Sequence, residues 1–497
     1  MSDILNLSTQ ESRLAQQKAP SSTGPTLPPP ASLLAAEASL PNPQSATYLQ
    51  GQSSSSTAAH IIRDIVPALT GQAHSSRYYG FVTGGVLPIA EWADNVVSHT
   101  DQNVQVHLPG QTVATAVEDA ALEMLARLLR LDMVTWAGRT FTTGATGSNI
   151  LGLACGREVI VKKRLDGEGV GELGLLAACM RAGVKEIQVL TSAGHSSLSK
   201  AASVVGLGRR SVKELGLSED QPWRLDIDAV EEALKKDGTA SIIAISAGDV
   251  NTGGYALEGI EEWKRVRELA DKYGAWIHVD GAMGVFARAL GDEPQYQLLK
   301  QRTEGIHLAD SITLDGHKLL NVPYDCGIFF TRAASTLSSV FVNPNAAYLA
   351  SSSAATIPSP LNIGLENSRR FRALPAYAVL LSEGRPGIAK LLSNMIELCR
   401  KLAVYLRESP HYELLPDEDA PLEGIFMILL FRAKKKAVND TLVERINQTR
   451  EMYVSGTKWK GEKAVRIAVS NWKVDIETDL GVVTRILDAV ADGTADC

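Results

Sequence analysis

A lysine at the end of a short apolar segment is the residue best suited to covalent chemistry. Residues 311–314 (SITL) are typical of a buried strand that breaks at Asp315-Gly316, so His317 and Lys318 should fall on a turn at the strand's end. A lysine at the edge of a sheet, beside a histidine and backed by apolar residues, is partly desolvated. Desolvation lowers the pKa of its amine, as imine formation requires. Most single lysines are simply exposed on the surface. The interpretation of Lys318 as a reactive amine therefore depends on which other functional residues are predicted to lie near it.

Four other features follow predicted strands in the same way. They are the glycine-rich turn at 144–147, His195 after IQVL (187–190), Ser246 ending SIIAIS (241–246) and Asp280 ending AWIHVD (275–280). Small residues at a strand-to-helix turn let backbone N–H groups approach a phosphate, although this turn has neither the Walker nor the GxGxxG pattern. Ligands of parallel sheets bind outside the carboxyl ends of the strands. We therefore expect these features and Lys318 to surround one site.

The alternation of strand and helix patterns indicates the fold class. From about 159 to 330, short apolar strands alternate with helical segments that end at a glycine, such as GIEEWKRVRELADKYG. This pattern predicts an α/β fold with a mainly parallel sheet covered by helices on both faces. The predicted divisions are a disordered arm rich in Ser, Ala, Gln and Pro (1–58), an N-terminal helical segment (59–110), a large domain (111–340), a mobile loop (341–374) and a smaller C-terminal α+β domain (375–497).

Composition and charge exclude several classes of function. A net charge of −7 without a basic patch argues against nucleic acid or an anionic membrane surface as a partner. The longest apolar runs, such as 425–431, are too short to span a bilayer, and the N-terminus has no signal-peptide pattern. Five cysteines without CxxC spacing indicate neither a disulfide framework nor a zinc site, so no metal is expected. These features predict a cytoplasmic protein.

The strand-end features together match the requirements of pyridoxal 5′-phosphate. Its aldehyde needs a lysine, here Lys318, and its pyridine nitrogen needs a carboxylate that keeps it protonated, here Asp280. Its ring needs a flat partner on one face, which His195 can supply. Its phosphate needs N–H groups and hydroxyls, and the candidates are Gly144, Ala145, Thr146 and His317.

Several motifs resemble those of the group II pyridoxal-phosphate decarboxylases, relatives of the aromatic-L-amino-acid and glutamate decarboxylases. The resemblance covers about 75–375, with its motifs in the family's order. They are SSRYYGFVTGG (75–85), TSAGHSSLSKA (191–201), HVDGAMG (278–284), DGHKLLNVPYDCG (315–327) and ENSRRFRAL (366–374). The resemblance implies the aspartate-aminotransferase-like fold (fold type I) and an obligate homodimer with active sites at the subunit interface. It also implies decarboxylation of an L-amino acid to CO₂ and an amine.

The resemblance also implies roles for individual residues. Lys318 would carry the cofactor as an imine, Asp280 would pair with the pyridinium, and His195 would stack on the ring. Ala282 would pack against the opposite face of the ring. Ser246 lies where the family has a hydroxyl near the ring oxygen.

The substrate side chain is indicated only by aromatic residues near the N-terminus. Tyr79 and Phe81 fall in the segment that contacts substrate in the family, and the same segment belongs to the family's dimer interface. With Tyr78, they predict an aromatic or apolar pocket, and plain core packing is the alternative. There is no clear basic cluster for an acidic side chain.

The mobile loop departs from the family pattern. In the aromatic decarboxylases it carries a tyrosine that donates a proton to Cα, and that place falls here near Pro360 with no tyrosine. Tyr348, earlier in the loop, and His195 are the alternative candidates. The departure leaves open another pyridoxal-phosphate reaction on the same fold, such as oxidative aldehyde synthesis, Cα–Cβ cleavage, condensation or substitution. A non-catalytic relative is a third possibility, against which the intact Lys318, Asp280 and His195 argue.

Overall fold

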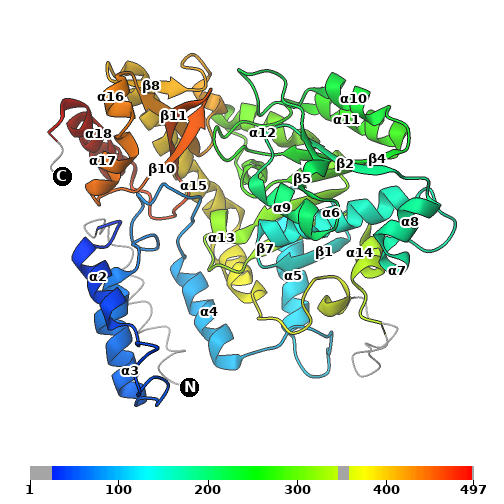
Figure 1. Cartoon of the computed structure of the whole chain (residues 1–497), viewed down its shortest axis with the longest axis horizontal. Coiled ribbons are helices and arrows are strands. Elements are labelled where there is room, and N and C mark those ends of the chain that lie inside the picture. Colours follow the sequence, from blue (N-terminus) through cyan, green and yellow to red (C-terminus); the bar gives the residue numbers. More distant parts are fainter. Residues whose placement is uncertain (1–24, 345–356, 495–497) are drawn as a thin grey trace.

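Two β-sheets organise the part of the chain that the computed structural model describes, residues 25–344 and 357–494 (Figure 1). The larger sheet has seven strands in the order β1-β7-β6-β5-β4-β2-β3, and the smaller has four in the order β10-β11-β9-β8. The strands of the larger sheet are β1 (Gly138–Thr142), β2 (Glu186–Thr191), β3 (Val212–Glu214), β4 (Thr239–Ser246), β5 (Trp276–Asp280), β6 (Ser311–Asp315) and β7 (Gly327–Thr331). Those of the smaller sheet are β8 (Tyr412–Leu415), β9 (Ile428–Ala433), β10 (Ser455–Trp459) and β11 (Glu462–Ala468).

The strand directions bring the carboxyl ends of the central strands to one edge. Strands β2 to β6 pair in parallel, whereas β7 is antiparallel to both β6 and β1. Since β1 therefore runs in the same direction as β6, its carboxyl end lies at the same edge. In register, Ser246 of β4 pairs with Asp280 of β5, which pairs with Thr313 of β6. The predicted α/β fold with a mainly parallel sheet is confirmed.

Helices cover both faces of the large sheet because its strands are apolar on both sides. In β4, Ile243 and Ile245 belong to one hydrophobic cluster, and the alternating Ile242 and Ala244 belong to another. The face with Ile242 packs against α6 (Ala145–Lys162), α7 (Val170–Leu173), α8 (Leu175–Arg181), α9 (Ser196–Val204) and α14 (Ala334–Phe341). The opposite cluster includes residues of α5 (Ala114–Leu128), α10 (Ile227–Leu234), α11 (Ile260–Tyr273) and α12 (Gln297–Thr303).

A long helix joins the large sheet to the small one. Helix α15 (Ala373–Glu408) packs against α4 (Pro88–Thr100) and α5 and then against the C-terminal helix α18 (Ile476–Asp492). It bends where Gly384 takes φ +56° and Pro386 follows. The short helices α16 (Lys436–Asn439) and α17 (Leu442–Gln448) complete the smaller domain. None of the helices in the described ranges combines the length and apolarity that crossing a bilayer requires.

Part of the N-terminal arm, predicted as disordered over residues 1–58, forms helices in the residues that the structure describes. Residues 1–24 lie outside the described residues, but α2 (Pro30–Ser39) falls within the rest of the arm and α3 (Ser54–His60) begins in it. Proline at the first helical position and the leucines and alanines after it favour α2 locally. The helix packs against residues 61–68, and the two helices extend below the C-terminal domain in Figure 1. The average composition of residues 1–58 therefore did not reveal the short helix-forming sequence at Pro30–Ser39.

The segment predicted as a mobile loop, 341–374, is in part docked. Residues 345–356, which include Tyr348, lie outside the described residues. Beyond them, Ser359 Oγ accepts the N–H of His107 at 3.0 Å, and the N–H of Leu361 donates to the carbonyl of Gln105 at 3.1 Å. These bonds hold the end of the segment against the N-terminal part of the chain, which the sequence did not indicate.

Candidate active site

A cleft of about 1470 Å³ lies at the carboxyl ends of the central strands. It is lined by most of the residues singled out in the sequence, namely Phe81, Gly144, Ala145, Thr146, His195, Ser246, Asp280, Ala282, His317 and Lys318. Apart from Phe81, which precedes α4, they lie at or just after the ends of β1, β2, β4, β5 and β6, strands that are far apart in the sequence and whose carboxyl ends share one edge of the sheet. The strand-end rule thus brings this set together.

Asp280 is the last residue of β5, and its carboxylate is held by the buried side chain of Asn149. Its Oδ2 accepts a hydrogen bond of 2.9 Å from Nδ2 of Asn149, which is buried on α6. Its Oδ1 lies 3.4 Å from the N–H of Ala282. Asn149 was absent from the sequence-based candidates, because it reads as an ordinary residue near a helix start. A carboxylate fixed in this way can face a ring nitrogen.

His195 lies at the start of α9 as its N-cap residue. Its Nδ1 lies 2.7 Å from Ser197 Oγ and also accepts the N–H of Ser197 at 3.2 Å. Both contacts restrain the imidazole ring at the edge of the cleft. The flat partner expected from the sequence is therefore held by its own helix.

Lys318 has an acidic neighbour that the sequence analysis did not pair with it. The residue belongs to a short helix, α13 (Gly316–Leu319), rather than to the predicted turn, and its side chain is 21% exposed. Its Nζ lies 2.9 Å from Oδ2 of Asp315, whose Oδ1 accepts the N–H of Ala145 at 2.6 Å. The amine is thus ion-paired as well as partly buried.

The ring of His317 lies between the backbone carbonyl of Cys326 and the carboxylate of Asp315. Its Nδ1 lies 3.1 Å from the carbonyl oxygen of Cys326, which can only accept, so Nδ1 carries a proton. Its Nε2 is 3.7 Å from Oδ1 of Asp315. Burial, together with the charge of Lys318, lowers the pKa of His317.

The glycine turn before α6 forms a cradle that a larger residue would fill. Gly144 has φ +156°, and a Cβ there would lie 3.3 Å from Cε1 of His317. A Cβ on the facing Gly327 would lie 2.4 Å from the Cα of Gly144. Open space beside N–H groups at the first turn of an 18-residue helix suits a phosphate. With an amine, a carboxylate and an imidazole around the same cleft, the donor set fits pyridoxal phosphate.

Of the two tyrosines at 78 and 79, the structure puts Tyr78 and not Tyr79 at the cleft. Tyr79 is fully buried, and its backbone bonds to Tyr453 and Ala468 of the C-terminal domain fix it facing inward. Tyr78 and Phe81 line the cleft and form an aromatic group with Tyr453, with ring centroids 4.7 Å (Tyr78) and 6.1 Å (Phe81) from the Tyr453 ring. Tyr79, which was expected to contact substrate, therefore does not line the cleft, whereas its neighbour Tyr78 does.

Arg466 is a cleft residue that sequence reasoning missed. It lies on β11, where a charged residue within the apolar segment RIAVS was the available signal. Its Nη1 donates to the carbonyl of Val250 at 3.2 Å and its Nη2 to that of Gly80. Burial lowers the pKa of the guanidinium. Arg466 thus ties the small domain to two loops of the cleft.

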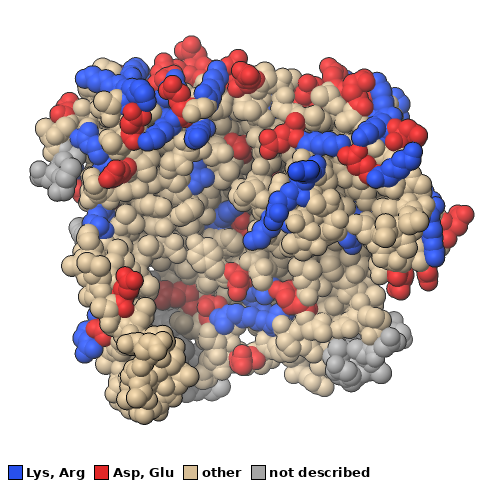
Figure 2. Space-filling view, viewed as in Figure 1, with Lys and Arg blue, Asp and Glu red and all other residues tan. Residues whose placement is uncertain are grey.

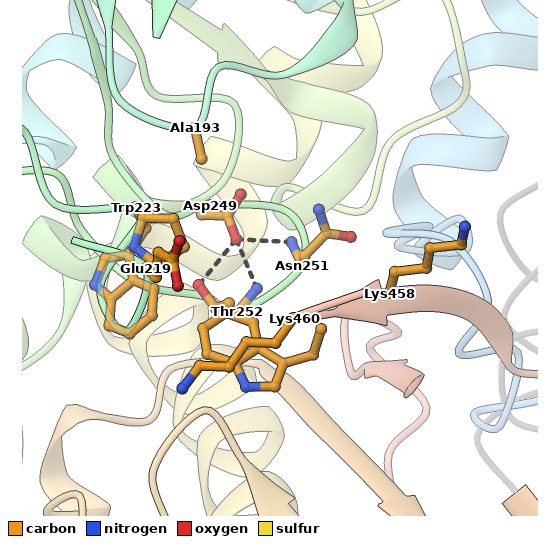
Figure 3. Close-up of a pocket in the computed structure, with 10 residues that line it drawn as sticks. Ala193, Glu219, Trp223, Asp249, Asn251, Thr252, Lys458 and Lys460 are labelled. Atoms are coloured by element: carbon orange, nitrogen blue, oxygen red, sulfur yellow. Dashed lines mark hydrogen bonds between the residues drawn. The ribbon is translucent and has the colours of Figure 1, made fainter. Parts of the chain in front are cut away.

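A side pocket of about 510 Å³ adjoins the cleft, and Ala193, Asp249 and Asn251 line both (Figure 3). Oδ2 of Asp249 accepts bonds from the N–H of Asn251 at 3.0 Å and from the N–H and hydroxyl of Thr252 at 2.7 and 2.8 Å. Trp223 and Trp459, with ring centroids 6.2 Å apart, form its apolar wall. The pocket widens the space available beside the cleft.

Comparison with known proteins identifies the family. The model of the pyridoxal-dependent decarboxylase conserved domain matches residues 62–426, and the chain belongs to this family. L-2,4-diaminobutyrate decarboxylase of Acinetobacter baumannii is 28% identical over 380 residues, which cover 71% of this chain and 70% of that protein. The protein is therefore a pyridoxal-phosphate-dependent carboxy-lyase, as the sequence predicted.

Solved structures share the fold over almost the whole chain. Tryptophan decarboxylase of Catharanthus roseus, in complex with L-tryptophan, superposes with a TM-score of 0.78 at 18% identity, covering 98% of this chain and 97% of that one. For 4-hydroxyphenylacetaldehyde synthase of Rhodiola rosea the TM-score is 0.77 at 17% identity, covering 99% of each chain. The predicted fold type is confirmed by this likeness.

Proposed function

We propose that this enzyme decarboxylates an L-amino acid with an aromatic or apolar side chain and releases CO₂ and the amine. The observation that carries the proposal is the arrangement of Lys318, Asp280 and His195 around one cleft whose wall includes Tyr78 and Phe81. When bound, pyridoxal phosphate supplies the electron sink that loss of CO₂ requires. The protein supplies attachment, orientation and placement of protons.

Each side chain has a distinct task in this proposal. Lys318 would hold the cofactor covalently, and Asp280 would keep a proton on its ring nitrogen. His195 and Ala282 would lie against the two faces of the ring. Ser246 would bond the ring oxygen. The phosphate would bind at Gly144, Ala145, Thr146 and His317.

The preference for an aromatic or apolar substrate rests on the wall of the cleft. Phe81 is 52% exposed there and packs with Tyr453, so its ring is available to a ligand. Arg466 is buried, and its Nη1 and Nη2 donate to the backbone carbonyls of Val250 and Gly80, so the side chain holds two loops of the cleft together. An aromatic amino acid therefore fits this wall better than an acidic one.

A second candidate, oxidative aldehyde synthesis, is favoured by one feature of the loop. The place expected for a proton-donating tyrosine falls near Pro360, which is buried beside the N-terminal part of the chain. Without such a donor, a carbanion is exposed to oxygen for longer. The fold likeness to an aldehyde synthase is compatible with this outcome.

A homodimer is proposed as the active form. Figure 2 shows the N-terminal helices as a largely uncharged projection, in contrast to the mixed charges above them. Large apolar side chains are exposed along this part of the chain, including Leu33, Leu34, Leu40, Ile62 and Leu69. Sedimentation equilibrium should give twice the chain mass, and a monomer with full activity would contradict the proposal.

A cytoplasmic location is proposed as well, because the four cysteines in the described ranges are free thiols.

The reaction is tested with carboxyl-labelled amino acids. The wild-type enzyme should release labelled CO₂ with an equal amount of amine from an aromatic substrate, and Lys318→Ala should release none. Peroxide, ammonia and aldehyde in place of the amine would establish the second candidate. Retention of the carboxyl label with every amino acid tested would overturn both.

A further inference from the structure

The side-chain amide of Asn149 connects the two groups that would hold the cofactor ring. Its Nδ2 lies 2.9 Å from Oδ2 of Asp280 and 3.2 Å from Oγ of Ser197. Ser197 in turn contacts Nδ1 of His195 at 2.7 Å. Asn149 is fully buried, so it reaches both groups from behind the cleft.

The protons of this network are ordered by the carboxylate of Asp280. A carboxylate only accepts, so the nitrogen of the Asn149 amide faces it and the amide oxygen must accept elsewhere. That oxygen lies 2.9 Å from Nε2 of His278, which must therefore carry the ring proton. Burial lowers the pKa of His278 to about 4, so at neutral pH the ring holds a single proton.

The other nitrogen of His278 completes the chain. Nδ1 must accept, and it lies 2.8 Å from Oγ of Ser311. The hydroxyl of Ser311 can donate to it because Ser311 itself accepts from the indole N–H of Trp276 at 3.0 Å. An indole N–H only donates, so the chain of donors runs in one direction from Trp276 to Asp280.

The branch through Ser197 fixes the proton of His195. The hydroxyl oxygen of Ser197 accepts from Asn149, so its proton is available to Nδ1 of His195. The backbone N–H of Ser197 also donates to Nδ1 at 3.2 Å. Since a backbone N–H cannot accept, Nδ1 has no proton, and the proton of the neutral ring is on Nε2.

Helix α6 is shaped to hold this network. Gly152 lies three residues after Asn149, on the same face of the helix. A Cβ at Gly152 would lie 2.3 Å from Cε1 of His278. Helix α6 thus supplies the amide of Asn149 and, at Gly152, the space for the imidazole of His278, which orients that amide.

We propose that Asn149 is a positioning residue that sets the orientation of the Asp280 carboxylate and of the Ser197 hydroxyl, which in turn contacts Nδ1 of His195. This inference rests on the proposed cofactor roles of those two residues and adds the group that coordinates them. Its consequence is that one amide holds the acid proposed to face the ring nitrogen and, through the hydroxyl of Ser197, supports the imidazole proposed to face the ring. Removal of this amide leaves the charge of the site unchanged, and the matched control below separates the loss of orientation from the general cost of a buried truncation.

The first test needs no cofactor. Nitrogen-15 spectra of histidine-labelled protein distinguish the two tautomers of each ring, and His278→Gln and His195→Gln assign the signals. Both rings should carry their proton on Nε2 in the wild-type protein. A proton on Nδ1 of His278 would reverse the donor order and overturn the proposal.

The second test compares Asn149→Ala with a matched control, Gln188→Ala. Gln188 is also buried, and its amide donates to Ser241 Oγ and to the carbonyl of Ala233, away from the cleft. Loss of a hydrogen bond to a charged group should weaken cofactor binding by about tenfold or more in Asn149→Ala, measured by equilibrium dialysis. The cofactor affinity of Gln188→Ala should stay within about twofold of the wild-type value. Its thermal stability should fall, because the lost buried hydrogen bonds support the fold and not the cofactor site.

Equal cofactor affinities for wild type and Asn149→Ala would overturn the positioning role. So would an equal loss of affinity in Gln188→Ala, because the effect would then follow from general destabilisation. Either result would leave the proposed function intact, provided that CO₂ release still depends on Lys318. Failure of the proposed function appears instead as loss of that dependence.

Discussion

Oδ2 of Asp315 lies 2.9 Å from Nζ of Lys318, and Oδ1 of the same carboxylate accepts the N–H of Ala145 at 2.6 Å. Asp315 thereby joins the end of β6 to the first turn of α6, two of the elements that border the cleft. A carboxylate at a helix N-terminus is favourable, and a phosphate is favoured at the same place for the same reason. A phosphate bound at Ala145, as proposed, would therefore compete with Asp315 for this N–H group.

Substitution of this acid should strengthen cofactor binding. In Asp315→Asn the negative charge beside the N–H of Ala145 is lost, so we expect the dissociation constant for pyridoxal phosphate to fall by about tenfold. Asp325→Asn is the matched control, because it removes the same charge from an exposed position ten residues further along the chain. Equilibrium dialysis at fixed ionic strength measures both. Weaker binding in Asp315→Asn would show that the carboxylate assists the phosphate instead.

Loss of the acid at the end of β5 should abolish turnover and spare the fold. Without Asp280 no carboxylate keeps the ring nitrogen protonated, so we expect kcat of Asp280→Ala to fall by about a hundredfold or more. The side chain is at the edge of the cleft, so the circular dichroism spectrum should match that of the wild type. Near-normal turnover in this variant would refute the pairing of Asp280 with the cofactor.

Buried His278 should make the protein sensitive to acid. Burial lowers its pKa from 6.5 to about 4, so between these values the unfolded chain binds a proton that the folded protein does not. Stability therefore falls as the pH drops from 6.5 towards 4, by of order 3 kcal/mol for this one group. Urea unfolding across this range should show a shallower loss in His278→Gln. His307→Gln, at an exposed position, should keep the wild-type slope, and equal slopes in all three proteins would contradict the prediction.

The strand ends were predictable because the signals are local. Apolar runs that stop at Asp280 or Ser246, together with the rule for parallel sheets, indicate a common edge without knowledge of the neighbours. Asn149 was not predictable, because its importance comes from His278 and Ser311, which meet it only in the folded chain. Arg466 reaches the cleft from a strand of the other sheet, a contact that no local pattern contains.

The choice between Tyr78 and Tyr79 shows a different limit. In an extended segment, neighbouring side chains point to opposite sides, so a shift of one residue exchanges the inner and outer positions. Bonds to Tyr453 and Ala468 decide that Tyr79 points inward. That register depends on a strand almost 400 residues later in the chain.

The aromatic wall should control substrate affinity. Phe81→Ala removes an exposed ring from the cleft, so we expect KM for an aromatic substrate to rise by about tenfold while kcat changes little. Tyr79→Phe is the control, since the buried Tyr79 hydroxyl has no hydrogen-bond partner among the described residues and its loss should leave KM unchanged. Steady-state kinetics of the two variants measure the difference. The preference for aromatic substrates fails if KM changes in Tyr79→Phe and not in Phe81→Ala.

Covalent attachment of the cofactor to Lys318 is tested most directly by borohydride reduction of the reconstituted enzyme, followed by peptide mapping. The wild-type protein should give one labelled peptide, which contains Lys318, and Lys318→Ala should bind the cofactor without any covalent label. Label retained in Lys318→Ala, or found on another cleft lysine such as Lys200, would contradict the assignment of the site.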